Sequence, residues 1–437
     1  MKRFSQGFKR ATLLTALVAA LLLVVTALAG AASAPQLLTE TNCVGSAAGC
    51  SAGFVLDNPQ GVALTSDGSR VLVASEGSDA LAVFLRGRNG QLTQSQGDEH
   101  KKACVSQTGD AGTCQDGHGL LGPTDVLTVS NNVYVASNGS NAIDMLLKDK
   151  DSKQFAQDPG AKGCINEDGS DGCADGHGLT GALSLAINPS GGGNFVYVGG
   201  DHTIAAFKRS TSSGELTQLP AGNPNFPSTA GCVNDDGTDG CEDQFVPGDV
   251  VGMAFSSDGK YLYAAVSGSP GAVLVFNRLP QGPLVYQGCF SDGGTGGCTP
   301  GTDLDNPTGI GLDRSGKNVY VASRGSGAVT IFSRDQRTGA IAQLGGTQFV
   351  ANLNRVAVAS NNKGAYATTD TGIISYVRDK KHGGALTQAD CMTNTGGCTA
   401  PAGNGLAGAQ AVFPSSSGKD VYVVGATDDS VVALKHT

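Results

Sequence analysis

Tryptophan is absent from the 437 residues of this chain, and charged residues are scarce at 15 %. The missing tryptophan excludes repeat proteins whose units carry a Trp signature. The 29 basic residues are outnumbered by 38 acidic ones, and the net charge of −9 argues against nucleic acid or an anionic membrane surface as a partner. The motifs G-x-S-x-G and H-E-x-x-H and the phosphate-binding loop are also absent, so no serine hydrolase, zinc protease or nucleotide-binding protein is indicated.

Glycine, in contrast, is abundant at 65 residues, about twice its average share. Apolar residues still make up 40 % of the chain. A disordered chain would have too few of them, so the glycines indicate many tight turns between buried segments.

Asn306–Leu344 is the clearest copy of a repeated unit and contains four predicted strands separated by turns. The strands are rich in β-branched and aromatic residues, and Gly, Ser and Asp lie between them. They span Gly309–Asp313, Val319–Ser323, Ala328–Ser333 and Ala340–Leu344. The second strand, VYVAS in this unit, has seven copies along the chain, at 71–75, 133–137, 196–200, 261–265, 319–323, 365–369 and 421–425.

The fourth strand of the unit has only six copies after the third strands. They lie at 91–95, 154–158, 215–219, 284–288, 340–344 and 385–389. Gln36–Glu40 (QLLTE) precedes the first unit and has the pattern of the missing copy. We therefore expect this N-terminal strand to complete the C-terminal unit, which leaves no unpaired ends.

Seven units with this offset predict an all-β fold over residues 36–437, a single seven-bladed β-propeller with four antiparallel strands per blade. An open solenoid is the alternative, but it requires polar capping repeats, and here the two ends complement each other instead. No linker or composition break interrupts the units, which argues against two separate domains.

Residues 1–34 are typical of an export signal, with four basic residues and no acidic one, an apolar run over 11–30 and small residues at 29–34. Pro35 disfavours cleavage after Ala34, so we expect the cut after Ala31 or Ala32. An uncleaved anchor is the alternative, because the apolar run approaches the ~20 residues that span a bilayer. We expect the protein outside a bacterial cell or at its surface.

The 12 cysteines all lie after this segment and form six close pairs. An even number of cysteines in an exported chain predicts disulfide bonds, and six to nine intervening residues fit zinc ligation poorly. The expected bonds are Cys43–Cys50, Cys104–Cys114, Cys164–Cys173, Cys232–Cys241, Cys289–Cys298 and Cys391–Cys398.

The segments 256–265 (SSDGKYLYAA) and 315–344 resemble the seven-bladed propellers of the lactonase (6-phosphogluconolactonase-like) family and the related YVTN-type surface-protein repeats. The resemblance extends through every repeat, but it concerns strand and turn positions. It therefore implies the fold and carries no catalytic residue over to this chain. WD40 and kelch units fit less well, because both use tryptophan. The cysteine loops, the export signal and Ser326, where lactonase repeats commonly have His, are departures.

The fold analogy gathers the cysteine loops and the second turns on one face, around the mouth of a central channel. Ionisable or small polar residues there suit a small polar ligand. The candidates are Asp125, Ser184 and Arg355 at the entrances of the first strands, and Glu76, Asn138, Asp201, His202, Arg324 and Asp370 in the second turns. A plain structural ion pair is the alternative for Asp125 and Arg355. Residues 345–354, the one junction without a cysteine pair, lead to Arg355.

Two further motifs suggest a metal, although we expect no cofactor. The loops 165–172 and 233–240 are acidic and rich in glycine, and carboxylates with backbone carbonyls suit calcium. The spacing does not match an EF-hand, so solvated turns are the alternative. His118 and His177 share the context Asp-Gly-His-Gly-Leu. They either form a pair that binds a metal or acts in acid–base chemistry, or they reflect the duplication of one loop. The acidic candidates are Asp168, Asp171, Asp236 and Asp239.

These features predict a secreted or cell-surface propeller that acts as a binding module for an unknown small polar ligand or an extracellular protein. An exported lactonase-like hydrolase is the alternative, in which carboxylates at the channel mouth activate water against a cyclic ester. We expect a monomer without a nucleic-acid partner, in contact with a membrane only if the N-terminal segment is uncleaved.

Overall fold

The structure, a computed structural model, describes residues 38–95, 103–149, 154–220, 231–345, 348–394 and 398–436. The predicted export signal lies outside the described residues, as do Gln36 and Leu37. Within the described ranges, no helix is long and apolar enough to cross a membrane.

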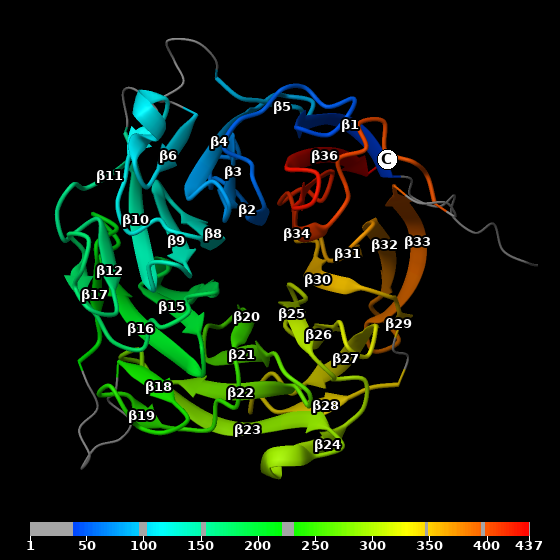
Figure 1. Ribbon diagram of the computed structural model, residues 1–437. Helices are drawn as coiled ribbons and strands as arrows, with labels where there is room; N and C mark the ends of the chain where they lie inside the picture. The colour runs from blue at the N-terminus through cyan, green and yellow to red at the C-terminus, as the bar shows by residue number, and fades with distance from the viewer. Residues whose placement is uncertain are drawn as a thin grey trace, which may run out of the picture. The chain divides into compact units, whose positions relative to one another are not determined.

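Seven small sheets are arranged around one axis (Figure 1). The innermost strand of each sheet contacts the innermost strand of the next, and the last contacts the first. We number the sheets along the chain as blades 1 to 7. The predicted all-β seven-bladed propeller is thereby confirmed.

Each blade contains three long antiparallel strands. The innermost strands are β2 (Pro59–Leu64), β8 (Pro123–Val129), β14 (Ser184–Ile187), β20 (Val250–Phe255), β25 (Pro307–Leu312), β30 (Leu353–Val358) and β34 (Ala409–Pro414). The second strands are β3 (Arg70–Ser75), β9 (Asn132–Ser137), β15 (Phe195–Gly200), β21 (Tyr261–Val266), β26 (Asn318–Ser323), β31 (Gly364–Thr369) and β35 (Asp420–Gly425). The third strands are β4 (Ala80–Arg86), β10 (Ala142–Lys148), β16 (Thr203–Arg209), β22 (Ala272–Arg278), β27 (Ala328–Arg334), β32 (Gly372–Asp379) and β36 (Ser430–His436).

The outer edges are made of shorter or composite strands. They are β1 (Leu38–Gly45), β5 (Leu92–Thr93), β6 (Cys104–Ser106), β11 (Phe155–Gln157), β12 (Cys164–Asn166), β17 (Leu216–Gln218), β18 (Cys232–Asn234), β23 (Leu284–Asp292), β28 (Ile341–Gln343), β29 (Gln348–Phe349) and β33 (Ala385–Thr393). Short parallel strands follow four of the cysteine loops, namely β7 (Gln115–Asp116), β13 (Ala174–Asp175), β19 (Glu242–Asp243) and β24 (Thr299–Gly301). Three 3-10 turns are described, at Gly109–Gly112, Ser190–Gly192 and Thr295–Gly297.

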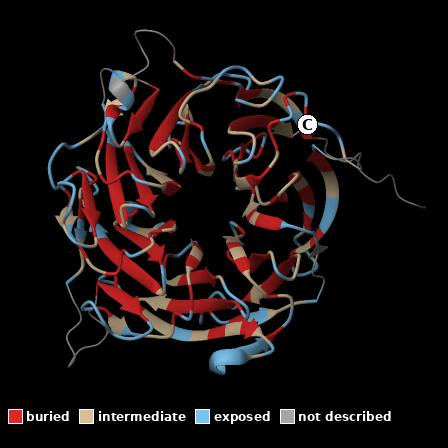
Figure 2. Cartoon of the chain, viewed as in Figure 1, coloured by how far each residue is buried: buried red, intermediate tan, exposed pale blue. Residues whose placement is uncertain are grey.

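The second strands are continuous apolar runs because both of their faces are covered. Every residue of β26 is buried, as is every residue of β9 (Figure 2). A sheet with a neighbour on each side has no solvent face, so its central strand does not alternate between apolar and polar residues. This arrangement explains why VYVAS is the clearest repeated sequence in the chain.

A tyrosine in most second strands connects its blade to the next one. The hydroxyl of Tyr263 donates to the backbone carbonyl of Gly339 at 2.7 Å and accepts from Nε of Arg334, the last residue of β27, at 2.5 Å. The tyrosine-to-glycine hydrogen bond occurs at five blade boundaries, namely the four successive ones from blade 2 to blade 6 and the one between blades 7 and 1. At four of these five boundaries an arginine Nε also donates to the tyrosine hydroxyl. The tyrosines are Tyr134, Tyr197, Tyr263, Tyr320 and Tyr422.

The ring closes as predicted, with the N-terminal strand in the C-terminal blade. Strand β1 pairs antiparallel with β36, and Leu38 lies opposite His436. The sheet order β1-β36-β35-β34 gives blade 7 its fourth strand from the other end of the chain. Leu38 is buried, so this strand adds apolar contacts to the edge as well as hydrogen bonds.

The outer edges depart from four simple antiparallel strands. In blade 2, β11 and β12 both pair with β10, one at each end, and β13 pairs in parallel with β12. The two cysteines of each pair lie on neighbouring outer segments, and all six predicted disulfides are present. The disulfide loops therefore add a short parallel strand to the edge in blades 1 to 4. Blade 5, the junction without cysteines, has β29 paired with β27 instead.

Candidate functional site

A β-bulge lies at the entrance of six innermost strands, just before the positions that the sequence aligns. In β8 the register shifts between Pro123 and Asp125, and in β30 it shifts between Leu353 and Arg355. Bulges increase the local twist and change the direction of the side chains beside them. The aligned positions therefore share one local geometry around the axis.

Asp125 of β8 is half-buried and bridges two blades. Its Oδ1 atom accepts a hydrogen bond from the N–H of Val126 at 2.9 Å, and its Oδ2 atom accepts one from Leu185 of β14 at 2.9 Å. Burial raises the pKa of the Asp125 carboxyl above its usual value, while the charge of Arg355 and the two N–H groups oppose that shift. Asp125 therefore takes up a proton more readily than an exposed aspartate does.

Arg355 of β30 extends its side chain past the neighbouring innermost strand. Its Nη1 atom donates to the carbonyl of Val251 in β20, two blades away, at 2.6 Å. A Cβ atom built on Gly309 would lie 3.0 Å from Cδ of Arg355, and one built on Gly252 would lie 3.5 Å from Nη1. The glycines at these aligned positions thus leave room for the guanidinium group.

Ser184 connects blades 3 and 4. Its hydroxyl donates to the carbonyl of Val250 at 2.6 Å, and the residue is 1 % exposed. The structure therefore places Ser184 at the axis as predicted, but its hydroxyl hydrogen is engaged within the scaffold.

Asp125 and Arg355 act on each other through their charges and not through a direct contact. Among the described residues, no ion pair within 4.0 Å joins them, although the Arg355 charge lowers the pKa of Asp125. Both residues are half-buried although strands surround them, so solvent reaches both. One acidic residue, Asp125, and one basic residue, Arg355, thus occupy the ring of aligned positions. The other members of the ring are Gly61, Ser184, Gly252, Gly309 and Ala411.

Arg324 and Asp370 form a bidentate ion pair between the second turns of blades 5 and 6. Nη1 and Nη2 of Arg324 lie 2.8 and 2.6 Å from the two carboxylate oxygens. Arg324 also donates to Asn354, the residue before Arg355. The hydrogen bonds from Arg324 hold the pKa of Asp370 below its usual value. These two predicted site residues therefore fix the entrance of β30.

Glu76 and Asn138, from the second turns of blades 1 and 2, are engaged in loop contacts. Oε2 of Glu76 accepts from the side chain of Asn58 at 3.0 Å. The N–H of Asn138 donates to the carbonyl of Gly122 at 2.9 Å. Both predicted residues thus support the loops on the disulfide face.

His202 lies among three carboxylates at the boundary of blades 3 and 4. Its Nδ1 atom is 2.8 Å from Asp235, and its Nε2 atom is 3.6 Å from Asp201. Burial opposes protonation of the imidazole, but Asp235, Asp201 and Asp249 together raise the pKa of His202. Burial and Asp201 raise the pKa of Asp249. Asp235 and Asp249 were absent from the sequence prediction, since neither lies at an aligned turn position.

The four aspartates considered for calcium bind backbone N–H groups. Asp168 and Asp236 each accept from the residue two positions later, at 3.0 Å. Asp171 and Asp239 accept from glycines of neighbouring loops, at 2.9 and 3.0 Å. Among the described residues, no group of three or more His, Cys, Asp or Glu is arranged to hold a metal ion. Calcium binding stays a prediction. A calcium ion would have to compete with these backbone N–H groups for the carboxylate oxygens.

His118 and His177 are held through their backbone. The side-chain amide of Gln157 binds both the N–H and the carbonyl of His118, each at 2.8 Å. Gln218 binds His177 in the same way, at 2.9 and 2.6 Å. These glutamines come from the predicted fourth strands, so the repeated Asp-Gly-His-Gly-Leu context is explained by a contact that the two loops share.

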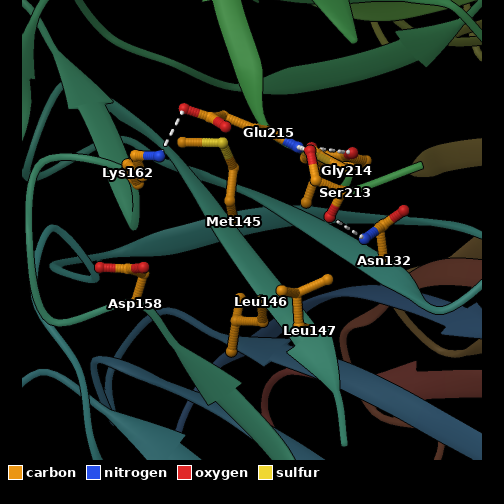
Figure 3. Close-up of a pocket in the computed structure, with 10 residues that line it drawn as sticks. Asn132, Met145, Leu146, Leu147, Asp158, Lys162, Ser213, Gly214 and Glu215 are labelled. Atoms are coloured by element: carbon orange, nitrogen blue, oxygen red, sulfur yellow. Dashed lines mark hydrogen bonds and ion pairs between the residues drawn. The ribbon is translucent and has the colours of Figure 1, made fainter. Parts of the chain in front are cut away.

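Two hollows lie away from the axis. One, of about 200 Å³, lies between blades 2 and 3 (Figure 3). Lys162 and Glu215 join across it at 3.4 Å, and Asn132 donates to the Ser213 carbonyl at 3.2 Å. The other, of about 550 Å³, lies beside the turns at the far ends of the innermost strands and is lined by residues that include Thr65, Asp67, Thr128, Ser360 and Ser415. The charged side chains that line the two hollows form ion pairs or hydrogen bonds with neighbouring residues.

Residues 252–358 match the model of a family described as "Lactonase, 7-bladed beta-propeller". Among solved structures, the putative 6-phosphogluconolactonases of Bacteroides uniformis and Bacteroides fragilis are similar, with 18 % and 17 % identity and a TM-score of 0.53 each. The similarity covers 76 % of this chain and 84 % and 83 % of theirs, respectively. Hydrazine synthase of Kuenenia stuttgartiensis is also similar, with 12 % identity, a TM-score of 0.53 and coverage of 87 % of this chain and 96 % of that one. No curated protein matches.

The resemblance to the lactonase propellers is thus confirmed, and at these identities the solved structures show the fold alone. The fold is shared with a protein named for other chemistry, so activity has to be argued from the site. The matched segment includes Arg355 but not Asp125.

Proposed function

We propose that this protein is a lactonase-like hydrolase that opens a cyclic ester at the axis of the propeller. Asp125 is the general base, and Arg355 binds the carbonyl oxygen of the substrate. One observation carries this proposal: a carboxyl with a raised pKa and a guanidinium group, both half-buried, occupy a ring of otherwise small residues. The lactonase match over 252–358 supports the substrate class.

Hydrolysis at this site needs no other residue. The ionised Asp125 removes a proton from water while the water oxygen bonds to the carbonyl carbon of the ester. The Arg355 guanidinium stabilises the negative charge that develops on the carbonyl oxygen. When the ring C–O bond breaks, the proton passes from Asp125 to the leaving oxygen, and the product is a hydroxy acid. The raised pKa of Asp125 makes it a stronger base than an ordinary aspartate once it is ionised.

The test is lactone opening by the purified protein on a panel of five- and six-membered lactones. We expect Asp125→Asn and Arg355→Met each to lower kcat/KM by at least about a hundredfold. Lys162→Met and Glu215→Gln are matched controls, because they remove one positive and one negative charge from an exposed ion pair away from the axis. They should leave kcat/KM within about threefold. Turnover that is unaffected by Asp125→Asn, or lost equally in the controls, would contradict the assignment.

A binding module remains the second candidate function. Six disulfides are compatible with an extracellular location, and the disulfide loops form an extended face. Under this alternative, Asp125 and Arg355 hold a small ligand of mixed charge and do no chemistry. Saturable binding of a lactone or hydroxy acid by a protein that never turns the lactone over would favour it.

A further inference from the structure

Two neighbouring blade junctions share one design and differ at the residue that follows the outer strand. At the first junction, Oε1 of Gln107 accepts from the N–H of Leu120 at 2.6 Å, and its amide donates to Oδ2 of Asp171 at 2.5 Å. The same oxygen accepts from the N–H of Gly119 at 2.9 Å. Gln107 follows β6 of blade 1, and Asp171 lies in the disulfide loop of blade 2. A side-chain amide thus joins the two blades.

Glu167 holds the equivalent position at the second junction. It accepts from the N–H groups of Leu179 and Gly178, the latter at 3.3 Å. Asp239, in the disulfide loop of blade 3, accepts from the same Gly178 N–H at 3.0 Å. Two carboxyl groups therefore converge on one donor, where the first junction has an amide and a carboxylate. Two ionised carboxylates would repel there, whereas a protonated one donates as the amide does.

We infer that Glu167 and Asp239 share one proton and form a pH-sensitive latch, which closes the seam between the disulfide loops of blades 2 and 3 when the proton is bound and loosens it when the proton is lost. This latch is independent of the proposed hydrolysis at the axis.

The electrostatics of the pair agree with this geometry. Burial and the neighbouring Asp239 raise the pKa of Glu167 to about 7, while the hydrogen bonds from Leu179 and Gly178 oppose the shift. Burial opposes ionisation of Asp239, but the hydrogen bond from Glu167 lowers its pKa. Glu167 is therefore the donor. Its contribution to stability is fully present below the unfolded value of 4.5 and is lost as the pH rises through about 7.

Few other titratable groups face the latch. Nδ1 of His177 lies 3.4 Å from Oδ1 of Asp239. Asp168, next to Glu167, turns to the N–H of Ser170 at 3.0 Å. The first junction contains a histidine in the same sequence context, His118, so each junction has a histidine beside its aspartate.

The first junction also has a buried acid of its own. A Cβ atom on Gly119 would lie 2.6 Å from Oδ1 of Asp144. Because Asp144 can also titrate, a comparison of the two junctions alone would not isolate Glu167. Each variant is therefore compared with wild type at the same pH.

The experiment is hydrogen exchange, followed by mass spectrometry on peptides that contain Gly178 and Leu179, in the full chain with its disulfides intact. Wild type and Glu167→Gln are compared at pH 5 and pH 8, so the intrinsic exchange rate cancels at each pH. We expect equal exchange at pH 5 and exchange at least about threefold faster in wild type at pH 8. Equal exchange at both pH values would overturn the latch.

A second variant keeps the test decisive if Glu167→Gln folds poorly. Gln107→Glu builds the carboxyl pair at the first junction, opposite Asp171. It should make exchange at Gly119 and Leu120 faster at pH 8 than in wild type, while leaving pH 5 unchanged. An unchanged pH dependence at these amides would contradict the proposal.

Discussion

At the scale of single residues, the tyrosine contacts between blades are made by side chains that are themselves buried. Tyr263 is fully buried, and its hydroxyl is both donor and acceptor. The side chain of Arg334 is 2 % exposed, so its charge depends on such partners. Removing one partner from a buried charged group costs more than the hydrogen bond itself contributes.

Tyr263→Phe should therefore lower the free energy of unfolding by about 1–3 kcal/mol, because it leaves Arg334 with one partner fewer. Chemical denaturation measures this change. Tyr376→Phe is the matched control, since its buried hydroxyl has no hydrogen-bond partner among the described residues. That substitution should change stability by less than about 0.5 kcal/mol. Equal effects of the two substitutions would contradict a role for the tyrosine contacts between blades.

The ion pair of Arg324 and Asp370 predicts a dependence of stability on pH. Because Arg324 lowers the pKa of Asp370, the pair stabilises the folded state above the ordinary aspartate pKa. The contribution is lost as the pH falls through the lowered value. The side chains are 38 % and 35 % exposed, so the contribution is only about 0.5–1 kcal/mol. Denaturation of wild type and Asp370→Asn should differ by this amount at pH 7 and converge as the pH falls through the lowered pKa of Asp370, whereas a constant difference would refute the pairing.

The sequence points to the axial positions more readily than to their neighbours. Asp125 and Arg355 could be named as candidates because they align with small residues at one repeat position. Asp235, Asp249 and Glu167 could not, since their roles depend on contacts with the adjoining blade. Such contacts depend on how close two blades lie to each other. The pattern of residues within one repeat unit carries no information about that distance.

At the scale of elements, the closure of the ring was predictable from counting strands. The missing fourth strand after the seventh unit identified β1 as its replacement, and the pairing of β1 with β36 confirms it. The split outer edges and the short parallel strands were not predicted. The short parallel strands follow from the disulfides, which bring the two ends of each cysteine loop together with Cα atoms 4.6–5.2 Å apart. The edge of blade 5, however, is split between β28 and β29 without a disulfide.

A chain that begins at Thr41 should be less stable than one that begins at Gln36. The shorter chain loses the pairing of Leu38, Thr39 and Glu40 with 434–436 and the burial of Leu38. We expect a loss of about 2–3 kcal/mol and a lower Tm in thermal unfolding. Both chains lack the predicted export signal, so that segment does not affect the comparison. An unchanged Tm would show that β1 does not contribute to closing the ring.

At the scale of the whole molecule, the fold and the function follow from different parts of the sequence. Strand and turn positions repeat in every unit, and they determine the propeller. The charges at the axis occur once each, so repetition gives no information about their role. This is why the resemblance to lactonase propellers establishes the architecture, while the proposed activity has to be argued from Asp125 and Arg355.

The most direct test of the proposed hydrolysis is the pH dependence of kcat/KM for lactone opening, in wild type and in Arg355→Met. Asp125 must be ionised to act as a base, so kcat/KM should fall on the acid side with a pKa above the ordinary aspartate value of 3.8. Removing the positive charge of Arg355 should shift this acid limb to higher pH, because that charge lowers the pKa of Asp125. An acid limb at the same pH in both proteins would contradict the account.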